Sequence, residues 1–315
     1  MGTFILILFG DGASVSSTLT NQPNFGFDMV SWGLGIVLAI YTAGPISGGH
    51  VNPNITLAFA VTKRIKWIDV IPYIISQILG ATTAAMVLLV WWGGVITRID
   101  PPPFLYANIA ASFFTQYPEP DFWSQYWPKE YIPTIVNSGA LYSQVNQVFP
   151  LWKGAFAKAL MTFLFLLIVV AVTDPDSPFY NKSLAPWAIG IGYVMLFLLF
   201  ETQLTGGMVN EARSWGPMLA LYLFGYRAGA FNFRGEYFYV YGIPDIIGGI
   251  LGALFWDHLL KPYLKFIKIG ERFLTAWGYI NCNGVNDTVY NDLSSIGTFT
   301  PFFALLVNKS IYLFS

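Results

Sequence analysis

Uncharged apolar runs separated by short polar segments are the main pattern along the chain. Four runs contain no charged residue and a fifth contains one, Asp245. A helix needs about 20 mainly apolar residues to cross a bilayer, so each run predicts one membrane span, some slightly short at an edge. The five runs are Met29–Gly49, Val70–Thr97, Ala159–Thr173, Ser183–Phe200 and Tyr237–Trp256.

The N-terminal segment predicts a sixth span. Met1–Phe9 is apolar, but nine residues at about 1.5 Å of helical rise cover only about 14 Å. A helix that continues to Leu19 must pass Asp11 and a Gly-rich turn. No basic residue precedes the run, which is untypical of a signal peptide. We therefore expect the outer part of a first helix whose beginning is missing from this sequence.

Two further apolar segments, Val51–Thr62 and Ser214–Tyr226, are too short to cross a bilayer. Non-spanning segments at membrane depth are tolerated only inside protein or along an aqueous cavity. The pattern therefore predicts two re-entrant helices in addition to the spans.

Composition excludes several classes of function. Of 315 residues, 55% are apolar and only 10% are charged, against about 25% in soluble domains, which argues strongly against a soluble enzyme. The formal net charge of −1 shows no basic surplus for nucleic acid. Cys282 is the single cysteine, and His50 and His258 lie far apart in sequence, so we expect no metal and no cofactor.

Basic residues indicate the orientation of the chain in the membrane. They follow the second span at Lys63–Lys66, lie between the fourth and fifth spans at Lys182, and follow the last span at Lys261–Arg272. Because basic residues accumulate in cytoplasmic loops, these places are assigned to the cytoplasm. The connection at Gly93–Trp152, rich in proline and aromatic residues, is then extracellular, and we expect it to be ordered.

The two halves of the chain share an ordered repeat. Residues 71–81 and 243–253 agree at eight of eleven positions, and Ser47–Asn52 corresponds to Thr205–Asn210. The offset between matched segments grows from 158 to 172, which predicts a 14-residue insertion near Arg227–Glu236. Each half holds three spans, an odd number, so the second half must enter the membrane upside down. Inverted repeats place a pore or binding site at the midplane, where broken helices meet.

The residues of this repeat resemble those of a known family. SGGHVNPN at Ser47–Asn54 and TGGMVNEARSWGP at Thr205–Pro217 are similar to the two Asn-Pro-Ala loops of the major intrinsic proteins, the aquaporins and aquaglyceroporins. The resemblance covers roughly Gly2 to Leu260 and is strongest to glycerol-conducting members. FGDG at Phe9–Gly12 and the long third loop are similar to fungal members.

The resemblance implies an all-α membrane protein with six transmembrane helices, two re-entrant half-helices and an inverted, aquaporin-like repeat. It implies a channel domain at 1–260, with halves 1–97 and 151–260, an extracellular loop at 93–152 and a cytoplasmic tail at 261–315. The implied half-helix motifs are Asn52, Pro53, Asn54, Asn210, Glu211 and Ala212. The implied selectivity filter is Trp32, Leu198, Gly207 and Arg213.

The resemblance also implies the function: a passive, multi-pass channel of the plasma membrane that catalyses no reaction. Its partners would be glycerol, water, other small neutral solutes and the lipid bilayer, without nucleic acid, in a homotetramer with one pore per subunit. Half-helix N-termini and Arg213 would repel protons and cations, while Trp32 faces the carbon side of a polyol.

This sequence departs from the family pattern in four places. Asn54 replaces the first motif's alanine, and Glu211 replaces the second motif's proline. Ser214 follows Arg213 where glycerol facilitators have aspartate. Lys158 occupies or adjoins the fourth-helix position of a family glutamate that supports a re-entrant loop.

Ordinary structural roles remain open for these residues. Both motif asparagines could be plain N-caps, Arg213 an interfacial anchor and Trp32 part of an aromatic belt. Glu201 could relay protons or merely accept hydrogen bonds from a loop. At the level of the whole chain, a proton-coupled secondary transporter and a non-conducting or structural family member remain alternatives to the channel. For Glu211, we expect a side chain that points away from the pore.

Overall fold

The computed structural model describes residues 1–20, 25–102, 104, 109–110, 112–113, 150–200, 209–227, 229–232, 242–264, 280–281 and 284–285. The chain divides into two units, Met1–Leu259 and Leu260–Ser315. In the second unit, β1 (Ile280–Asn281) pairs with β2 (Gly284–Val285) in an antiparallel ladder. All the elements that build the site belong to the first unit.

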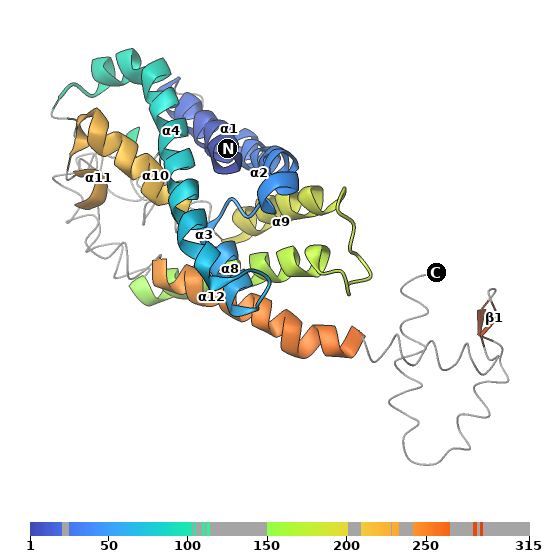
Figure 1. Ribbon diagram of the computed structural model, residues 1–315. Helices are drawn as coiled ribbons and strands as arrows, with labels where there is room; N and C mark the ends of the chain where they lie inside the picture. Colours follow the sequence, from blue (N-terminus) through green and yellow to red (C-terminus); the bar gives the residue numbers. More distant parts are fainter. Residues whose placement is uncertain are drawn as a thin grey trace. The chain divides into compact units, whose positions relative to one another are not determined.

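The described part of the first unit contains six long helices and two short ones, in the order that the repeat predicts (Figure 1). The first half holds α1 (Gly2–Leu19), α2 (Phe25–Ser47), α3 (Pro53–Val61) and α4 (Trp67–Ile99). The second half holds α8 (Leu151–Thr173), α9 (Ala185–Phe200), α10 (Glu211–Leu221) and α12 (Ile243–Phe255). Two π-helical turns, η1 (Tyr222–Tyr226) and η3 (Trp256–Leu260), extend α10 and α12, and α11 (Gly229–Asn232) is a short connection.

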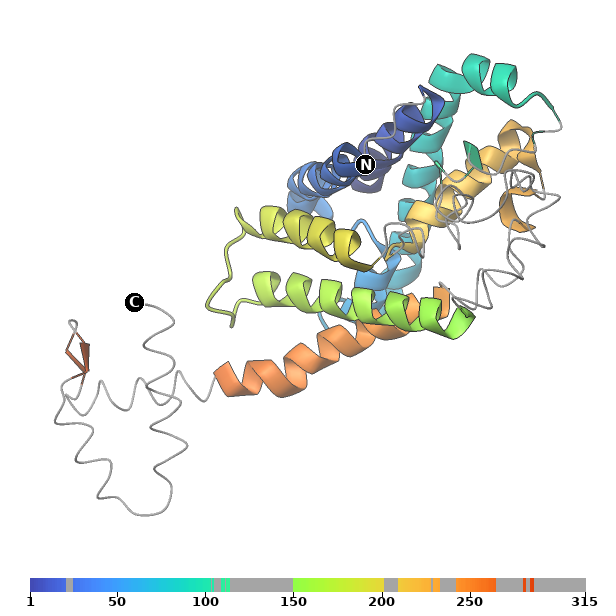
Figure 2. The same ribbon diagram turned by 180° about the vertical axis from the view of Figure 1, so that it is seen from behind.

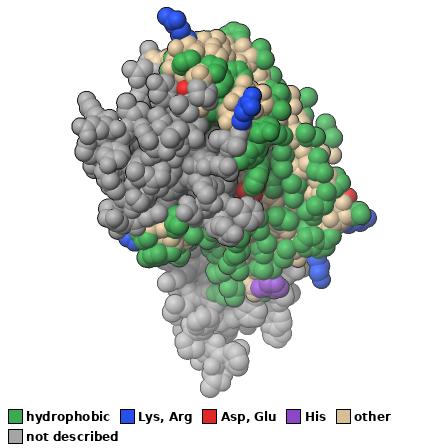
Figure 3. Space-filling model, turned by 90° about the vertical axis from the view of Figure 1, so that its left-hand side faces the viewer, with side chains coloured by type: hydrophobic (Ala, Val, Ile, Leu, Met, Phe, Trp, Pro, Cys, Tyr) green, Lys and Arg blue, Asp and Glu red, His purple; other side chains and the backbone are tan. Residues whose placement is uncertain are grey.

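The lengths and surfaces of these helices fit a membrane. Helices α1, α2, α4, α8 and extended α12 are long and apolar enough to cross it, and α9 is a shorter apolar helix of 16 residues. Apolar side chains cover much of the described exterior (Figure 3), and Val90 and Trp91 are 88% and 79% exposed. Such a surface is compatible with lipid, and five of the six predicted spans are helices long and apolar enough to cross a membrane.

The first helix differs from the expectation in one respect. Helix α1 continues through Gly10–Gly12 without the predicted turn, and Asp11 inside it is fully buried. The local reason is close packing, because a Cβ at Gly10 would overlap the Trp32 ring of α2. The glycine therefore permits contact between two helices and does not break one.

The helices pack in a pattern that respects the inverted repeat. Helix α1 contacts α2 and α4, while its counterpart α8 contacts α9 and α12 (Figures 1 and 2). Each half-helix also packs against the last long helix of the opposite half, α3 against α12 and α10 against α4. The two halves are thus interlocked, because the half-helix of each half packs against a long helix of the other.

Two glycines allow the close contact between α8 and α12. A Cβ at Gly248 would overlap the backbone of Ala159, and one at Gly252 would overlap that of Phe163. Small residues at this spacing let helix backbones approach each other in membranes. The repeated Gly-Ala pairs at 80–81 and 252–253 therefore mark packing positions.

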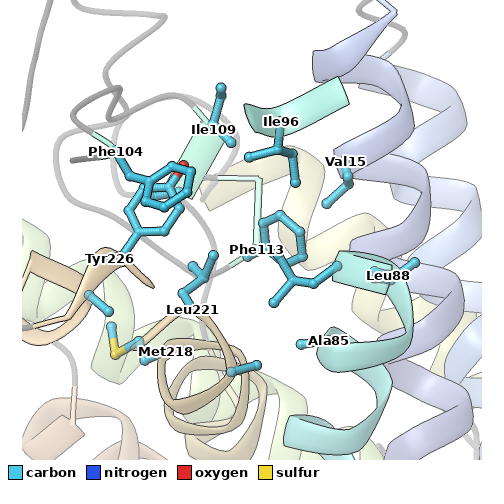
Figure 4. Close-up of a cluster of buried hydrophobic side chains, with 14 residues drawn as sticks. Val15, Ala85, Leu88, Ile96, Phe104, Ile109, Phe113, Met218, Leu221 and Tyr226 are labelled. Atoms are coloured by element: carbon cyan, nitrogen blue, oxygen red, sulfur yellow. The ribbon is translucent and has the colours of Figure 1, made fainter. Parts of the chain in front are cut away.

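A buried apolar cluster joins both halves on the side where α4 ends (Figure 4). It combines Val15 of α1, Leu88 of α4 and Leu221 of α10 with Phe104 and Phe113. The last two belong to the connection that follows α4, which begins after Ile99 and not at Gly93 as predicted. Most of this connection lies outside the described residues.

A charged cluster joins three helix ends on the opposite side of the first unit. Arg64, between α3 and α4, donates to both carboxylate oxygens of Asp257 at 2.7 Å and to Asp174 at 3.1 Å. Burial tends to lower the pKa of Arg64, but the two carboxylates outweigh it and raise the pKa above its ordinary value. Trp256 also donates to Asp174, at 2.9 Å. The cluster fixes the ends of α8 and α12 to the turn after α3.

We predict that alanine is tolerated at Gly94 and is not tolerated at Gly252. Gly252→Ala should destabilise the protein by about 1–3 kcal/mol, because the new methyl group overlaps α8. Gly94→Ala is the control, because nothing lies within 4 Å of a Cβ there and alanine favours a helix. Thermal unfolding in detergent measures both, and equal stability of the two variants would contradict the packing described for Gly252.

Candidate functional site

Two asparagines join the half-helices at the centre of the first unit. The Asn52 side-chain nitrogen donates to the backbone oxygen of Val209 at 2.7 Å, and that of Asn210 donates to Val51 at 2.9 Å. The first half supplies the donor in one bond and the acceptor in the other, as an inverted repeat requires. The predicted approach of the two half-helix N-termini is confirmed.

Each asparagine also caps its own half-helix. The Asn52 oxygen accepts the backbone N–H of Asn54 at 2.8 Å, and the Asn210 oxygen accepts that of Ala212 at 3.1 Å. Capping satisfies part of the orphan donors at a helix N-terminus. An amide nitrogen carries two hydrogens, and the described bonds use one of them on each asparagine. The N-cap role and a donor role toward a solute are therefore compatible.

The loop before α3 has a tight backbone. Gly48, Gly49 and Val51 all have positive φ, at +75°, +67° and +45°. Glycine adopts this region readily, whereas the β-branched Val51 does so at a cost. The strained turn aims the Val51 oxygen at Asn210, so the motif residues before Asn52 serve the contact between the halves.

A cavity of about 590 Å³ passes the two asparagines. Its polar wall includes His50, Asn52, Asn210 and Arg213, and its apolar wall includes Leu6, Ile36, Ile40, Val169, Val172 and Ile189. A lining that combines hydrogen-bonding groups with hydrocarbon suits a small molecule that carries both hydroxyl groups and carbon.

Trp32 and Arg213 lie together in the lining of this cavity. The Arg213 guanidinium carbon is 4.9 Å from the Trp32 ring centroid, a cation–π arrangement. Arg213 is only 6% exposed, and it lies in the first turn of α10 directly after the Asn210 cap. The structure therefore brings two of the four predicted filter residues into contact.

Of the other two predicted filter residues, the structure describes only Leu198, and Leu198 does not lie at this point. Leu198 on α9 is 44% exposed and is not among the residues that line the cavity. On the same helix, Tyr193 lines the cavity, and its ring lies 6.5 Å from that of Trp32. Gly207 and Glu201 lie outside the described residues. The i, i+4 spacing of Ile189 and Tyr193 is the signal that could have indicated the inward face of α9.

His50 of the cavity wall is held by polar groups of α3 and α4 behind it. His50 hydrogen-bonds Thr56 at 3.2 Å, and Gln77 donates to the same hydroxyl at 3.0 Å. The His50 ring also contacts the rings of Phe59 and Tyr73, with centroids 5.0 and 4.9 Å apart. His50 is therefore a packed residue of the cavity wall, and the sequence pattern did not identify Thr56 or Gln77.

The unusual residues of the two motifs lie together and away from the cavity. The Glu211 carboxylate accepts the Trp215 indole N–H at 3.2 Å and is 8% exposed. Asn54 is a polar neighbour of this carboxylate, and the charge of Lys158 acts on it. Neither Glu211 nor Lys158 lines the cavity. Glu211 thus points into polar contacts behind the half-helix.

Lys158 is fully buried in α8 and belongs to a larger polar group. One helical turn later, Thr162 donates to the buried carboxylate of Asp245 on α12 at 2.6 Å and also to the Lys158 backbone oxygen at 3.0 Å. Where the family pattern has glutamate on the fourth helix and proline in the motif, this chain has a lysine and a glutamate. Lys158 and Glu211 carry opposite formal charges, so the two residues together are formally neutral.

Comparisons with known proteins agree with this geometry. The family described as major intrinsic protein matches residues 1–256. The chain is 30% identical over 266 residues to Aquaglyceroporin-2 of Rhizophagus irregularis, covering 82% of this chain and 75% of that protein. It is also 30% identical over 261 residues to the glycerol uptake facilitator protein of Buchnera aphidicola, covering 80% and 88%. The X-ray structure of the aquaglyceroporin from Plasmodium falciparum superposes with a TM-score of 0.67 at 19% identity, covering 84% of this chain and 96% of that one, which confirms the predicted fold.

We predict strong coupling between Lys158 and Glu211. Lys158→Met should destabilise the protein by about 3–5 kcal/mol, because it leaves a buried carboxylate without its cation. Adding Glu211→Gln should restore most of that loss, since no uncompensated charge remains at this pair. Thermal unfolding of the single and double variants measures the coupling.

The control is Lys153→Met in the same helix, where the lysine is exposed. It should change stability by less than about 0.5 kcal/mol. A double variant as unstable as Lys158→Met alone would show that Glu211 and Lys158 do not act as a pair.

Proposed function

Because the chain belongs to the major intrinsic protein family, we propose that it is a passive transmembrane channel for glycerol, other small neutral solutes and water. The names of its relatives, Aquaglyceroporin-2 and glycerol uptake facilitator protein, support glycerol as a substrate. Members of this family are channels and not enzymes, so no reaction is assigned. We further propose a homotetramer, located in the plasma membrane, with one pore in each subunit.

One observation carries the proposal: a single cavity passes both half-helix N-termini and reaches Trp32 and Arg213. The N-terminus of a helix carries roughly half a positive charge, so the two ends together disfavour cations near Asn52 and Asn210. Neutral hydroxyl groups can accept hydrogen bonds from the asparagine amides and from Arg213. The apolar residues of the lining contact the carbon atoms of the solute, which need no hydrogen-bond partner.

We assign the proposed roles accordingly. Asn52, Pro53 and Asn54 start the first half-helix, and Asn210, Glu211 and Ala212 start the second. Trp32 and Arg213 form the constriction, to which the family resemblance adds Gly207, whereas Leu198 lies away from the cavity.

A non-conducting or structural role is the principal alternative, and it was suggested by Glu211 and Lys158. Their position behind α10 favours conduction, because neither side chain occupies the cavity. A buried glutamate beside a buried lysine replaces the family's support of the half-helix with a different support. Proton-coupled transport is disfavoured for Glu211 by the same placement.

Purified protein in vesicles distinguishes the three functions. In hyperosmotic glycerol, vesicles shrink and then reswell as glycerol enters, which light scattering records. A channel should accelerate reswelling equally with and without a proton or sodium gradient. Dependence on a gradient would indicate a coupled transporter, and reswelling no faster than in empty vesicles would support the non-conducting alternative.

We predict that Gly207→Tyr narrows the constriction. Glycerol flux should fall by more than tenfold, because the larger solute loses its clearance, whereas water flux should fall by about threefold or less. The two rates are measured on the same vesicles by reswelling in glycerol and by shrinkage in sucrose. Equal loss of both rates would contradict the assignment of Gly207 to the filter.

A further inference from the structure

A buried acid adjoins the constriction and has no role in the function proposed above. Asp11 of α1 is 0% exposed, and neither of its carboxylate oxygens has a hydrogen-bond partner among the described residues. Asp11 forms an ion pair with Arg213, whose Nη2 lies 4.0 Å from the Asp11 Oδ1. Arg213 Nε and Nη1 also have no hydrogen-bond partner within the described ranges. The two charged groups thus face each other in a site where these four atoms have no described hydrogen-bond partner.

The surrounding contacts fix where Asp11 can lie. A Cβ at Gly10 would overlap the Trp32 ring, so α1 and α2 touch at the residue before Asp11. Four residues after Gly10, Ser14 accepts the Trp32 indole N–H at 3.4 Å. Trp32 in turn lies against the Arg213 guanidinium. Carboxylate, guanidinium and indole therefore form one contiguous group assembled from α1, α10 and α2.

Burial makes an unpaired carboxylate at this position costly. A charge buried inside a protein is tolerated only when it is paired or neutralised. An acidic residue inside a membrane segment is by default a candidate functional residue. A guanidinium group is a permanent cation in proteins. Because Asp11 does not line the cavity, any effect on a solute must pass through Arg213.

We propose that Asp11 is a positioning residue of the constriction: its carboxylate is the counter-ion of Arg213 and brings the net charge of the Trp32–Arg213 group to zero. This inference rests on the proposed channel function. Neutral solutes then meet hydrogen-bond donors without a net field, and cations are not attracted as long as Arg213 offsets the negative charge of Asp11. Loss of Arg213 alone converts the constriction from neutral to negative.

Charge counting gives a sharp test with four versions of the full chain. The formal charge of the Asp11–Arg213 pair is zero in the native chain, positive in Asp11→Asn, negative in Arg213→Gln and zero in the double variant. Each is reconstituted in vesicles, and proton and potassium leak are measured with a pH-sensitive dye and a potassium electrode. Arg213→Gln should leak cations about tenfold faster than the native chain, because a buried negative charge attracts them.

Adding Asp11→Asn to Arg213→Gln should return the leak to within about threefold of the native rate, because the pair is neutral again. Asp11→Asn alone should leak no more than the native chain. Asp11→Glu, which keeps the charge, should resemble the native chain. A merely structural role for Asp11 predicts the reverse, since a second destabilising change would add to the leak and not remove it.

Two control double variants test whether the charge comes from Asp11. Asp69→Asn removes the same charge from an exposed position at the start of α4, and Glu211→Gln removes the other acid near the start of α10. Combined with Arg213→Gln, neither should abolish the leak. If Glu211→Gln abolishes it and Asp11→Asn does not, the proposal is overturned.

Glycerol flux on the same vesicles separates this inference from the proposed function. A native chain that does not conduct glycerol would refute the channel, whatever the order of the leaks. A native chain that conducts glycerol, together with an Arg213→Gln variant that does not leak, would refute the role of Asp11 alone. That second result needs no Asp11 variant, so it stands even if Asp11→Asn fails to fold.

Discussion

The reciprocal bonds between Asn52 and Val209 and between Asn210 and Val51 are the contact on which the rest of the site depends. A helix that stops at the membrane midplane leaves backbone N–H groups without water to satisfy them. Each asparagine caps its own half-helix and binds the opposite loop, so two broken helices complete each other. The cavity and the position of Arg213 both follow from where this contact places α10.

Buried charged groups elsewhere in the described membrane region also lie beside a polar or oppositely charged partner. Glu211 lies behind α10 within the influence of Lys158, Thr162 donates to Asp245, and Asp11 faces Arg213. Buried ion pairs seldom add much net stability, but removal of one partner is expensive. These contacts therefore hold the side chains around the half-helices in place. The carboxylates of Glu211, Asp245 and Asp11 do not line the cavity.

The sequence was sufficient to predict the spans, the half-helices and their meeting point, because apolar length and an ordered repeat are both local patterns. It did not predict that α1 continues past Gly10, since a glycine that breaks a helix and one that permits packing look alike in one dimension. For the site, Trp32, Arg213 and the asparagines could be located from the motifs. The pairing of Lys158 with Glu211 and of Asp11 with Arg213 depends on contacts between distant helices, and neither follows from spacing.

The exchange of half-helices between the two halves has a consequence for how the protein is made. Helix α3 leaves the ribosome long before Val209 and α12, the groups that satisfy its cap and cover its side. The first half alone therefore lacks the partners that Val209 and α12 supply, and these contacts form only after about 150 further residues are synthesised. The pore is consequently completed late, when the second half reaches the membrane.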